Sequence, residues 1–420
     1  MTPSNISKSP IKKDRMFYRF SLYGFLKNLR FFGPFILLIF ADNGLSYLQI
    51  GLLYSIRDIA TNILEIPTGV YADAFGRRKS MVMAFTSYIA AFIIFYAFGD
   101  FYIYALAMVL FAAGEAFRSG THKALILEHL KINNMQDLKV AYYGRTRSAS
   151  QFGSAINSLI AAGLVFYSGG YEYMFIASII PYVLDLINLA TYPKELDGEL
   201  KQIKKGAVME QIRGTLKAFG GIFTNLQAMR AILNSASFSA MFKITKDYLQ
   251  PILAALTLSL PVFVSLTDTK REAVIIGVVY FGIYLLTSYA SRHAGRFSER
   301  FANITQAVNI TFLFGAGFLF LAGVTTWLSV AFISVVVFLG FYVLQNLRRP
   351  INVGVISDQI SSEVMASGLS VESQFTTLLV AAFSPLMGFL ADTLGVGAAL
   401  TLFGAGMVLL FGLVRIKTAK

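Results

Sequence analysis

Charged side chains interrupt several long apolar runs of this sequence. Arg30 lies deep in one run, Glu115 precedes Arg118 by one helical turn, and Lys243 and Asp247 are four residues apart. A charge at the centre of a bilayer costs at least about 2.5 kcal/mol, so it usually faces a cavity or a partner. The spacings also allow structural ion pairs within one helix, Glu115 with Arg118 and Lys243 with Asp247. The candidate lining of a solute-binding cavity comprises Arg30, Glu115, Arg118, Lys243, Lys246 and Asp247.

Two carboxylates in another apolar run could carry protons. Asp58 and Glu65 are seven residues apart, which places them on one face of a helix, with Thr61 and Asn62 between them. Such a face is typical either of hydrogen bonding between helices or of protonatable groups that couple proton movement to transport. Asp185 stands alone in its run, and we expect it to be buried against a neighbouring helix.

The charges of the predicted cavity are unbalanced. The three runs that contain them carry five cations, Lys27, Arg30, Arg118, Lys243 and Lys246, and two anions, Glu115 and Asp247. A cavity with a net positive charge favours an anionic substrate. Lys27 has a second interpretation, because its long side chain could reach the membrane surface.

Composition identifies the chain as a membrane protein. Of its 420 residues, 56% are hydrophobic and 14% are charged, which is more apolar side chain than a soluble protein of this length can bury. There is no cysteine, and the three histidines make a poor metal site, so we expect no disulfide, metal or other cofactor. No phosphate-binding loop and no Gly-x-Ser-x-Gly motif occurs, which argues against ATP use and against an enzyme.

Twelve apolar segments are long enough to cross a bilayer, since each crossing needs about 20 residues. They divide the chain into a cytoplasmic tail (1–19), a six-helix bundle (20–192), a linker with an amphipathic surface helix (193–229) and a second six-helix bundle (230–416). The predicted helices are at about 20–41, 47–72, 80–98, 101–121, 145–167, 171–192, 230–253, 272–291, 304–323, 326–347, 373–391 and 396–414.

The net charge of +13 follows the predicted topology. Of the 36 Lys and Arg residues, only Lys270 and Arg271 fall in a predicted outside loop. Because cations accumulate on the cytoplasmic side of membrane proteins, both termini are predicted to be cytoplasmic. This placement accounts for the basic composition without a nucleic-acid partner.

The turn between the second and third predicted helices carries a motif. It reads Gly69-x-x-x-Asp73-x-x-Gly76-Arg77-Arg78-Lys79, with a glycine suited to a sharp reversal and three consecutive cations after it. This pattern resembles the signature loop of the major facilitator superfamily. The resemblance implies an all-α integral membrane fold of twelve helices in two pseudo-symmetric six-helix bundles. It also implies an inner latch, in which Asp73 docks against the cytoplasmic end of helix eleven; its residues would be Gly69, Asp73, Gly76, Arg77 and Arg78.

The resemblance implies a secondary active transporter that works by alternating access in the cell membrane. We expect a monomer that contacts membrane lipid, a small-molecule substrate and protons. It would act either as an efflux antiporter or as an importer of an anionic metabolite. The alternative is a membrane sensor or scaffold of the same fold that moves no solute, with a basic linker and tail that bind lipid or a cytosolic partner.

Overall fold

The computed structural model describes residues 13–200, 202, 206, 208–210, 213–214, 226–359 and 365–417, without side-chain detail at 140–141, 357–359 and 365–370. Every regular element within these ranges is a helix. The tail residues before 13 and most of the predicted amphipathic linker helix lie outside the described residues.

The helices up to the linker form the N-terminal half of the chain. Most of them match a predicted crossing, while α6 lies in a segment that we predicted to be a connection. Their bounds are α1 Arg15–Leu26, η1 Gly33–Phe35, α2 Ile36–Asp42, α3 Tyr47–Phe75, α4 Arg77–Ala97, α5 Phe101–Arg118, α6 Thr121–Ile132, η2 Gln136–Leu138, α7 Lys139–Ser168, α8 Met174–Ala190 and η3 Lys194–Asp197.

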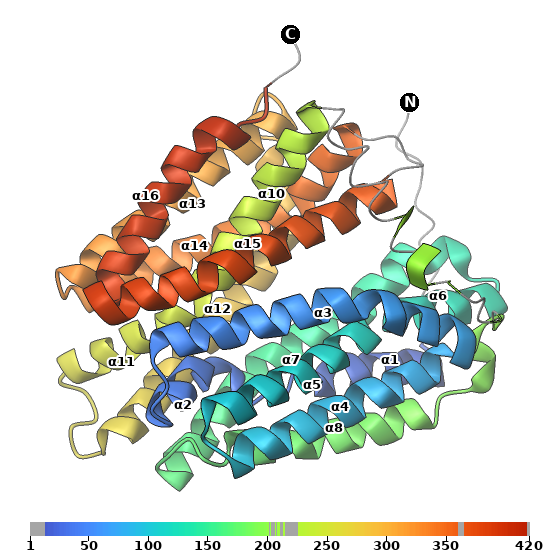
Figure 1. Cartoon of the computed structure of the whole chain (residues 1–420), viewed down its shortest axis with the longest axis horizontal. Coiled ribbons are helices and arrows are strands. Elements are labelled where there is room, and N and C mark those ends of the chain that lie inside the picture. The colour runs from blue at the N-terminus through green and yellow to red at the C-terminus, as the bar shows by residue number, and fades with distance from the viewer. Residues whose placement is uncertain are drawn as a thin grey trace.

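The helices after the linker form the C-terminal half. In Figure 1 the labelled helices α10 and α13 to α16 occupy the upper part of the molecule, above those of the N-terminal half. Their bounds are α10 Leu226–Thr245, η4 Lys246–Tyr248, α11 Leu249–Ser259, α12 Asp268–Ser298, α13 Ile304–Trp327, α14 Ala331–Gln359, α15 Met365–Leu394 and α16 Val396–Val414.

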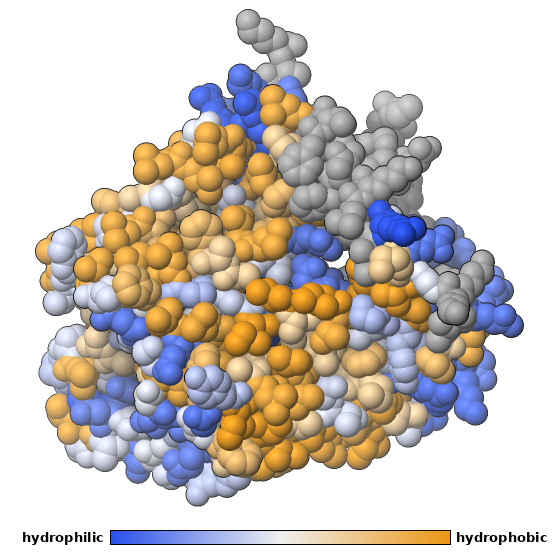
Figure 2. Space-filling view, viewed as in Figure 1, coloured by the Kyte–Doolittle hydropathy of each residue, from blue (hydrophilic) through white to orange (hydrophobic). Residues whose placement is uncertain are grey.

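The helices present apolar side chains to their surroundings. Eight of those described are long and apolar enough to cross a membrane, and Gly33–Asp42 and Met174–Ala190 are shorter apolar helices. Hydrophobic side chains cover much of the face in Figure 2, and hydrophilic ones gather toward its margins. An exposed apolar belt of this kind is compatible with lipid and not with water. The protein is therefore an all-α membrane protein with several crossings.

The first and seventh predicted helices are not continuous, contrary to our prediction of unbroken helices at 20–41 and 230–253. The first stops at Leu26 and resumes at Gly33, next to Pro34, which cannot donate a backbone hydrogen bond. The seventh changes to a 3-10 turn at Lys246–Tyr248. Short polar interruptions inside crossings are typical of binding sites in transporters, provided that neighbours satisfy the freed backbone groups.

Side chains of other helices satisfy the backbone at the first interruption. Tyr182 donates a hydrogen bond to the Lys27 carbonyl at 3.0 Å, and Asn157 donates one to the Arg30 carbonyl at 3.1 Å. The Phe31 amide donates to the Ser178 hydroxyl at 3.0 Å. Side chains of α7 and α8 therefore stabilise the interruption. Because the Arg30 backbone is bound in this way, its side chain has a defined position within the N-terminal half.

The two halves meet along two helix pairs, α3 with α15 and α7 with α12. Glycines permit the close approach. A methyl group on Gly388 of α15 would collide with the backbone of Tyr47 and Leu48 at the start of α3, and one on Gly51 would collide with the backbone of Ser384. Small residues at such contacts are the usual way in which membrane helices approach closely.

We expect Gly388→Ala to disrupt this contact. The added methyl group has no space, and overpacking of this kind typically costs about 1–3 kcal/mol. The midpoint of thermal unfolding of the purified protein in detergent should fall. Gly406→Ala on α16 is the matched control, because, apart from the neighbouring backbone of α16 itself, no atom lies within 4 Å of the position of its new methyl group. Equal unfolding midpoints for the two variants would contradict the close packing.

Candidate functional site

A cavity of about 510 Å³ lies between the two halves, next to both helix interruptions. Its volume is within the usual range of small-molecule sites. Of the six predicted cavity charges, Arg30, Glu115, Arg118, Lys246 and Asp247 line it, while Lys243 lines an adjoining cavity of about 310 Å³. The lining of the larger cavity includes Lys27, Arg30, Ile36, Arg57, Glu115, Arg118, Ser154, Phe242, Lys246, Asp247, Tyr280, Tyr284 and Tyr342.

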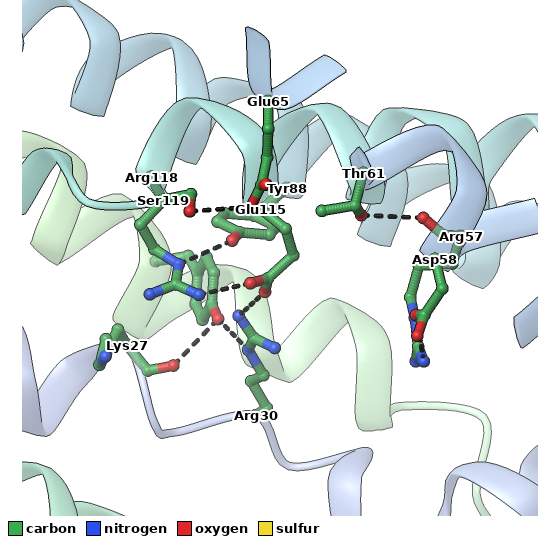
Figure 3. A network of polar contacts seen from close by, with 11 residues as sticks. Lys27, Arg30, Arg57, Asp58, Thr61, Glu65, Tyr88, Glu115, Arg118 and Ser119 are labelled. Carbon is green, nitrogen blue, oxygen red and sulfur yellow. Dashed lines mark hydrogen bonds and ion pairs between the residues drawn. The ribbon is translucent and has the colours of Figure 1, made fainter. Parts of the chain in front are cut away.

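Arg30 and Arg118 share the carboxylate of Glu115 (Figure 3). The Arg30 Nη2 atom lies 2.8 Å from Glu115 Oε1, and Arg118 pairs with the other carboxylate oxygen. Tyrosine hydroxyls complete the cluster, since Arg118 donates to Tyr88 at 3.0 Å and Arg30 donates to Tyr182. The predicted pairing of Glu115 with Arg118 is therefore present, but it is one part of a three-residue cluster that joins the broken first helix to α5.

Asp58 is placed between cations from both halves. Its Oδ1 atom lies 2.7 Å from Arg57, and its Oδ2 atom lies 3.8 Å from the Lys243 ammonium group of α10. The Asp58 side chain is only 11% exposed, so the loss of either partner would leave a charge with little water around it. The pair between Asp58 and Lys243 is a direct electrostatic link across the interface of the two halves.

Glu65, the second predicted proton carrier, has a different environment. It is half-buried and accepts a hydrogen bond from the Ser119 hydroxyl at 2.9 Å, as Figure 3 shows. Asp58 and Glu65 line the same adjoining cavity. Of these two carboxylates, only Asp58 forms an ion pair with a cation of the other half within the part of the chain that the structure describes.

Of the two alternatives for Lys243 and Asp247, the ion pair within one helix does not form. Asp247 pairs instead with its neighbour Lys246, at 2.6 Å, and Lys243 faces Asp58. The reason is the 3-10 turn at Lys246–Tyr248, because residues four apart face the same way only in a continuous α-helix. Tyr342 of α14 holds this turn by donating to the Lys246 carbonyl at 2.8 Å.

Sequence reasoning missed part of the cavity wall. Tyr280 and Tyr284 of α12 and Tyr342 of α14 line it, and as aromatic residues in apolar helices they carry no signal that separates a cavity from a core. Glu372 of α15 precedes the predicted start of that crossing and was not among the predicted site residues; it links α15 to α10 by accepting a hydrogen bond from Ser235 at 3.0 Å. Asp185 is fully buried, as expected.

The signature loop is anchored within the N-terminal half. Gly76 has φ 103°, a conformation that favours glycine, and the following Arg78 amide donates to the Asp197 carboxylate at 2.7 Å. Arg77 lies 3.4 Å from Glu128 of α6. Asp73 and Gly69 are exposed. The predicted docking of Asp73 involves the start of α15, where residues 360–364 lie outside the described residues and 365–370 lack side-chain detail.

Contacts between the halves gather at the end of the cavity where α3 begins. The Asp392 carboxylate, near the end of α15, accepts hydrogen bonds from the amides of Tyr47 and Leu48 at 2.9 and 2.8 Å. Gln250 of α11 accepts from the Leu37 amide at 2.8 Å. At the opposite end, residues of both halves, including Arg147 and Arg349, line a third cavity of about 380 Å³. Among the described residues, no group of three or more His, Cys, Asp or Glu side chains could hold a metal ion.

Glu115→Gln should destabilise the protein. Amide replacement leaves the guanidinium groups of Arg30 and Arg118 without their shared charge, and removing one partner of a buried pair costs up to about 3–5 kcal/mol. We expect about 1–3 kcal/mol here, because these side chains are 22–27% exposed. Thermal unfolding measures the loss, with Glu65→Gln as the control of smaller effect. A Glu115→Gln variant as stable as the parent would show that the cluster contributes nothing to folding.

Three solved structures resemble the whole fold. A mutant of the nucleoside transporter NupG has a TM-score of 0.77 at 14% identity, with 95% of this chain and 98% of that chain covered. A POT family transporter in complex with 5-aminolevulinic acid has a TM-score of 0.70 at 13% identity, with 95% of each chain covered. The D-xylose-proton symporter has a TM-score of 0.66 at 16% identity, with 95% of this chain and 96% of that chain covered. At these identities the likeness shows the fold alone.

The sequence comparisons identify the family. An uncharacterized MFS-type transporter, YxaM of Bacillus subtilis (strain 168), is 33% identical to this chain over 107 residues. The match covers 25% of this chain and 26% of that relative. The model of the Major Facilitator Superfamily matches residues 20–371, which is most of the chain. The chain therefore belongs to the Major Facilitator Superfamily of membrane transporters.

Proposed function

We propose that the protein is a secondary active transporter that moves a small solute across the cell membrane by alternating access, with the central cavity as its binding site. The observation that carries the proposal is a charged cavity between the halves, with contacts between them gathered at one end. A solute could then enter from the other end, and rocking of the halves would exchange the two openings.

Orientation in this proposal follows the predicted topology. With both termini in the cytoplasm, α3 begins at the outer surface, so the contacts of Asp392 close the outer side and the third cavity opens inward. The signature loop would form the opposite closure through Asp73 when the cavity opens outward. The transporter would be a monomer in the plasma or inner membrane, surrounded by lipid.

The Asp392 closure gives a test of alternating access. A carboxylate at a helix N-terminus contributes up to about 2 kcal/mol, and two charge-assisted hydrogen bonds are lost in Asp392→Ala. We expect the outward-open population to rise about 5- to 30-fold. The chain has no cysteine, so Ile36→Cys in the cavity can be labelled with an impermeant maleimide from the outer side without background.

Thr393→Ala is the matched control for this labelling, because the Thr393 hydroxyl donates only to the Phe389 carbonyl of its own helix. If labelling from the outer side is faster in Asp392→Ala and unchanged in Thr393→Ala, the result supports alternating access. A labelling rate that responds to neither substitution, together with no solute flux in proteoliposomes, would favour the sensor or scaffold that moves no solute.

We infer that proton coupling acts through Asp58. As pH falls and the carboxylate is protonated, its attraction for Arg57 and Lys243 is lost, and with it a link between the halves. The ion pairs of Asp58 therefore stabilise the contact between the halves at high pH, and this stabilisation is lost as pH falls and Asp58 is protonated. One structural neighbour is a D-xylose-proton symporter, which is consistent with coupling to protons in this fold.

This coupling predicts a pH-dependent conformation. The rate of labelling of Ser154→Cys from the cytoplasmic side, divided by the rate for free cysteine at the same pH to remove the titration of the thiol, should rise several-fold as pH is lowered, since the halves separate more easily. Asp58→Asn should remove the pH dependence, and Asp58→Glu should restore it. If Glu65→Gln abolishes the response while Asp58→Asn retains it, the coupling group is Glu65 and the role of Asp58 is refuted.

A further inference from the structure

We propose that the cavity binds an aromatic organic acid, with its carboxylate near Lys27, Arg30 and Arg118 and its ring against Tyr280, Tyr284 and Tyr342. This inference rests on the proposed function, because it assigns the chemistry of the solute to the same cavity. Two features carry it, an excess of positive charge on one wall and a group of aromatic rings on the other.

The cationic wall belongs to the N-terminal half. Lys27 lies at the end of α1, where the first helix is interrupted, and its Nζ atom is 5.3 Å from the centre of the Tyr23 ring. Among the described residues, no carboxylate lies within ion-pair distance of it. Arg30 and Arg118 share the single carboxylate of Glu115. These three cations and one anion leave an excess of positive charge that an acid could neutralise.

A cationic solute would find no free partner in the same cavity. Glu115 already pairs with two guanidinium groups, and Asp247 pairs with Lys246 at 2.6 Å. A positively charged ligand would therefore have to break one of these pairs and face an unpaired arginine or lysine. The pairing pattern, and not only the sum of charges, favours an anion.

Aromatic rings of both halves line the cavity, Phe32, Phe95, Phe111 and Phe175 in the N-terminal half and four more, here called the aromatic wall, in the C-terminal half. Tyr280 and Tyr284 lie one turn apart on α12, and Tyr342 of α14 packs edge-on against Phe242 at 4.9 Å between ring centres. All four side chains line the cavity. Aromatic side chains contribute contact area and prefer edge or offset packing against another ring, so this wall suits a planar ligand better than an aliphatic one.

The separation of the two walls connects binding to movement. Lys27, Arg30 and Arg118 come from the N-terminal half, whereas Tyr280, Tyr284 and Tyr342 come from the C-terminal half. A ligand with one group at each wall would contact both halves together. Its binding free energy would then depend on their relative position, which is the requirement for a solute to shift a conformational equilibrium.

Thermal unfolding of the full-length protein in detergent tests the proposal with defined probes. The aromatic acids are benzoate, cinnamate, indole-3-acetate and 1-naphthoate. Each is compared with its neutral primary amide and, for benzoate and 1-naphthoate, with the saturated-ring acid. We expect at least one aromatic acid to raise the unfolding midpoint at concentrations at which its amide and the saturated acids have no effect, because a ligand of the folded state stabilises it.

Variants of each wall separate the two contributions. Lys27→Met should weaken binding of the active acid about tenfold or more, and Lys27→Arg should restore it, because a hydrogen bond to a charged group is involved. Tyr284→Leu should reduce the preference for the aromatic over the saturated acid, while Tyr284→Phe should keep it. A Lys27→Met variant that unfolds on purification is replaced by Lys27→Gln, which is also neutral.

The proposal is overturned if no acid of the panel stabilises the protein, if amides act as strongly as acids, or if saturated and aromatic acids act equally. It is also overturned if Lys27→Met binds the active acid as the parent does. These failures are distinct from failure of the proposed function. A protein whose cavity cysteine responds to Asp392→Ala but which binds none of these acids would remain a transporter of another solute.

Discussion

The sharing of Glu115 by Arg30 and Arg118 is the interaction on which the centre of this molecule depends. In a membrane, a charge must be satisfied by other parts of the protein, because lipid offers no partner. One carboxylate serves two guanidinium groups here, and the hydroxyls of Tyr88 and Tyr182 supply further acceptors. This arrangement keeps polar side chains at the cavity wall while leaving positive charge to spare.

The helix interruptions follow from the same constraint. Breaking a crossing at 27–32 frees backbone groups that only neighbouring helices can satisfy, and Asn157, Ser178 and Tyr182 do so. The 3-10 turn of the seventh crossing is held in the same way by Tyr342. Both halves thus interrupt their first crossing beside the cavity. These side chains therefore fix the backbone that carries the charged residues of the cavity.

Two kinds of contact join the halves, and their physics differs. Gly51 and Gly388 allow α3 and α15 to pack closely, which depends on shape and is insensitive to pH. The contacts of Asp392 with the start of α3 and of Asp58 with Lys243 depend on charge. A molecule that alternates between two openings needs contacts of the second kind, since each polar group can be exchanged to another polar partner or to water at a cost of a few kcal/mol.

Hydropathy, charge and glycine placement are local properties, and they were enough to predict the membrane class, most of the helix positions, the signature loop and five of the charges that line the cavity. The partners of those charges, in contrast, depend on how the helices pack. The spacing of Lys243 and Asp247 allowed a pair along one helix, yet Lys243 faces Asp58 of the other half. The tyrosines of the cavity were hidden, since a tyrosine in an apolar run looks the same whether it faces lipid, core or cavity. Packing between helices far apart in sequence makes that choice.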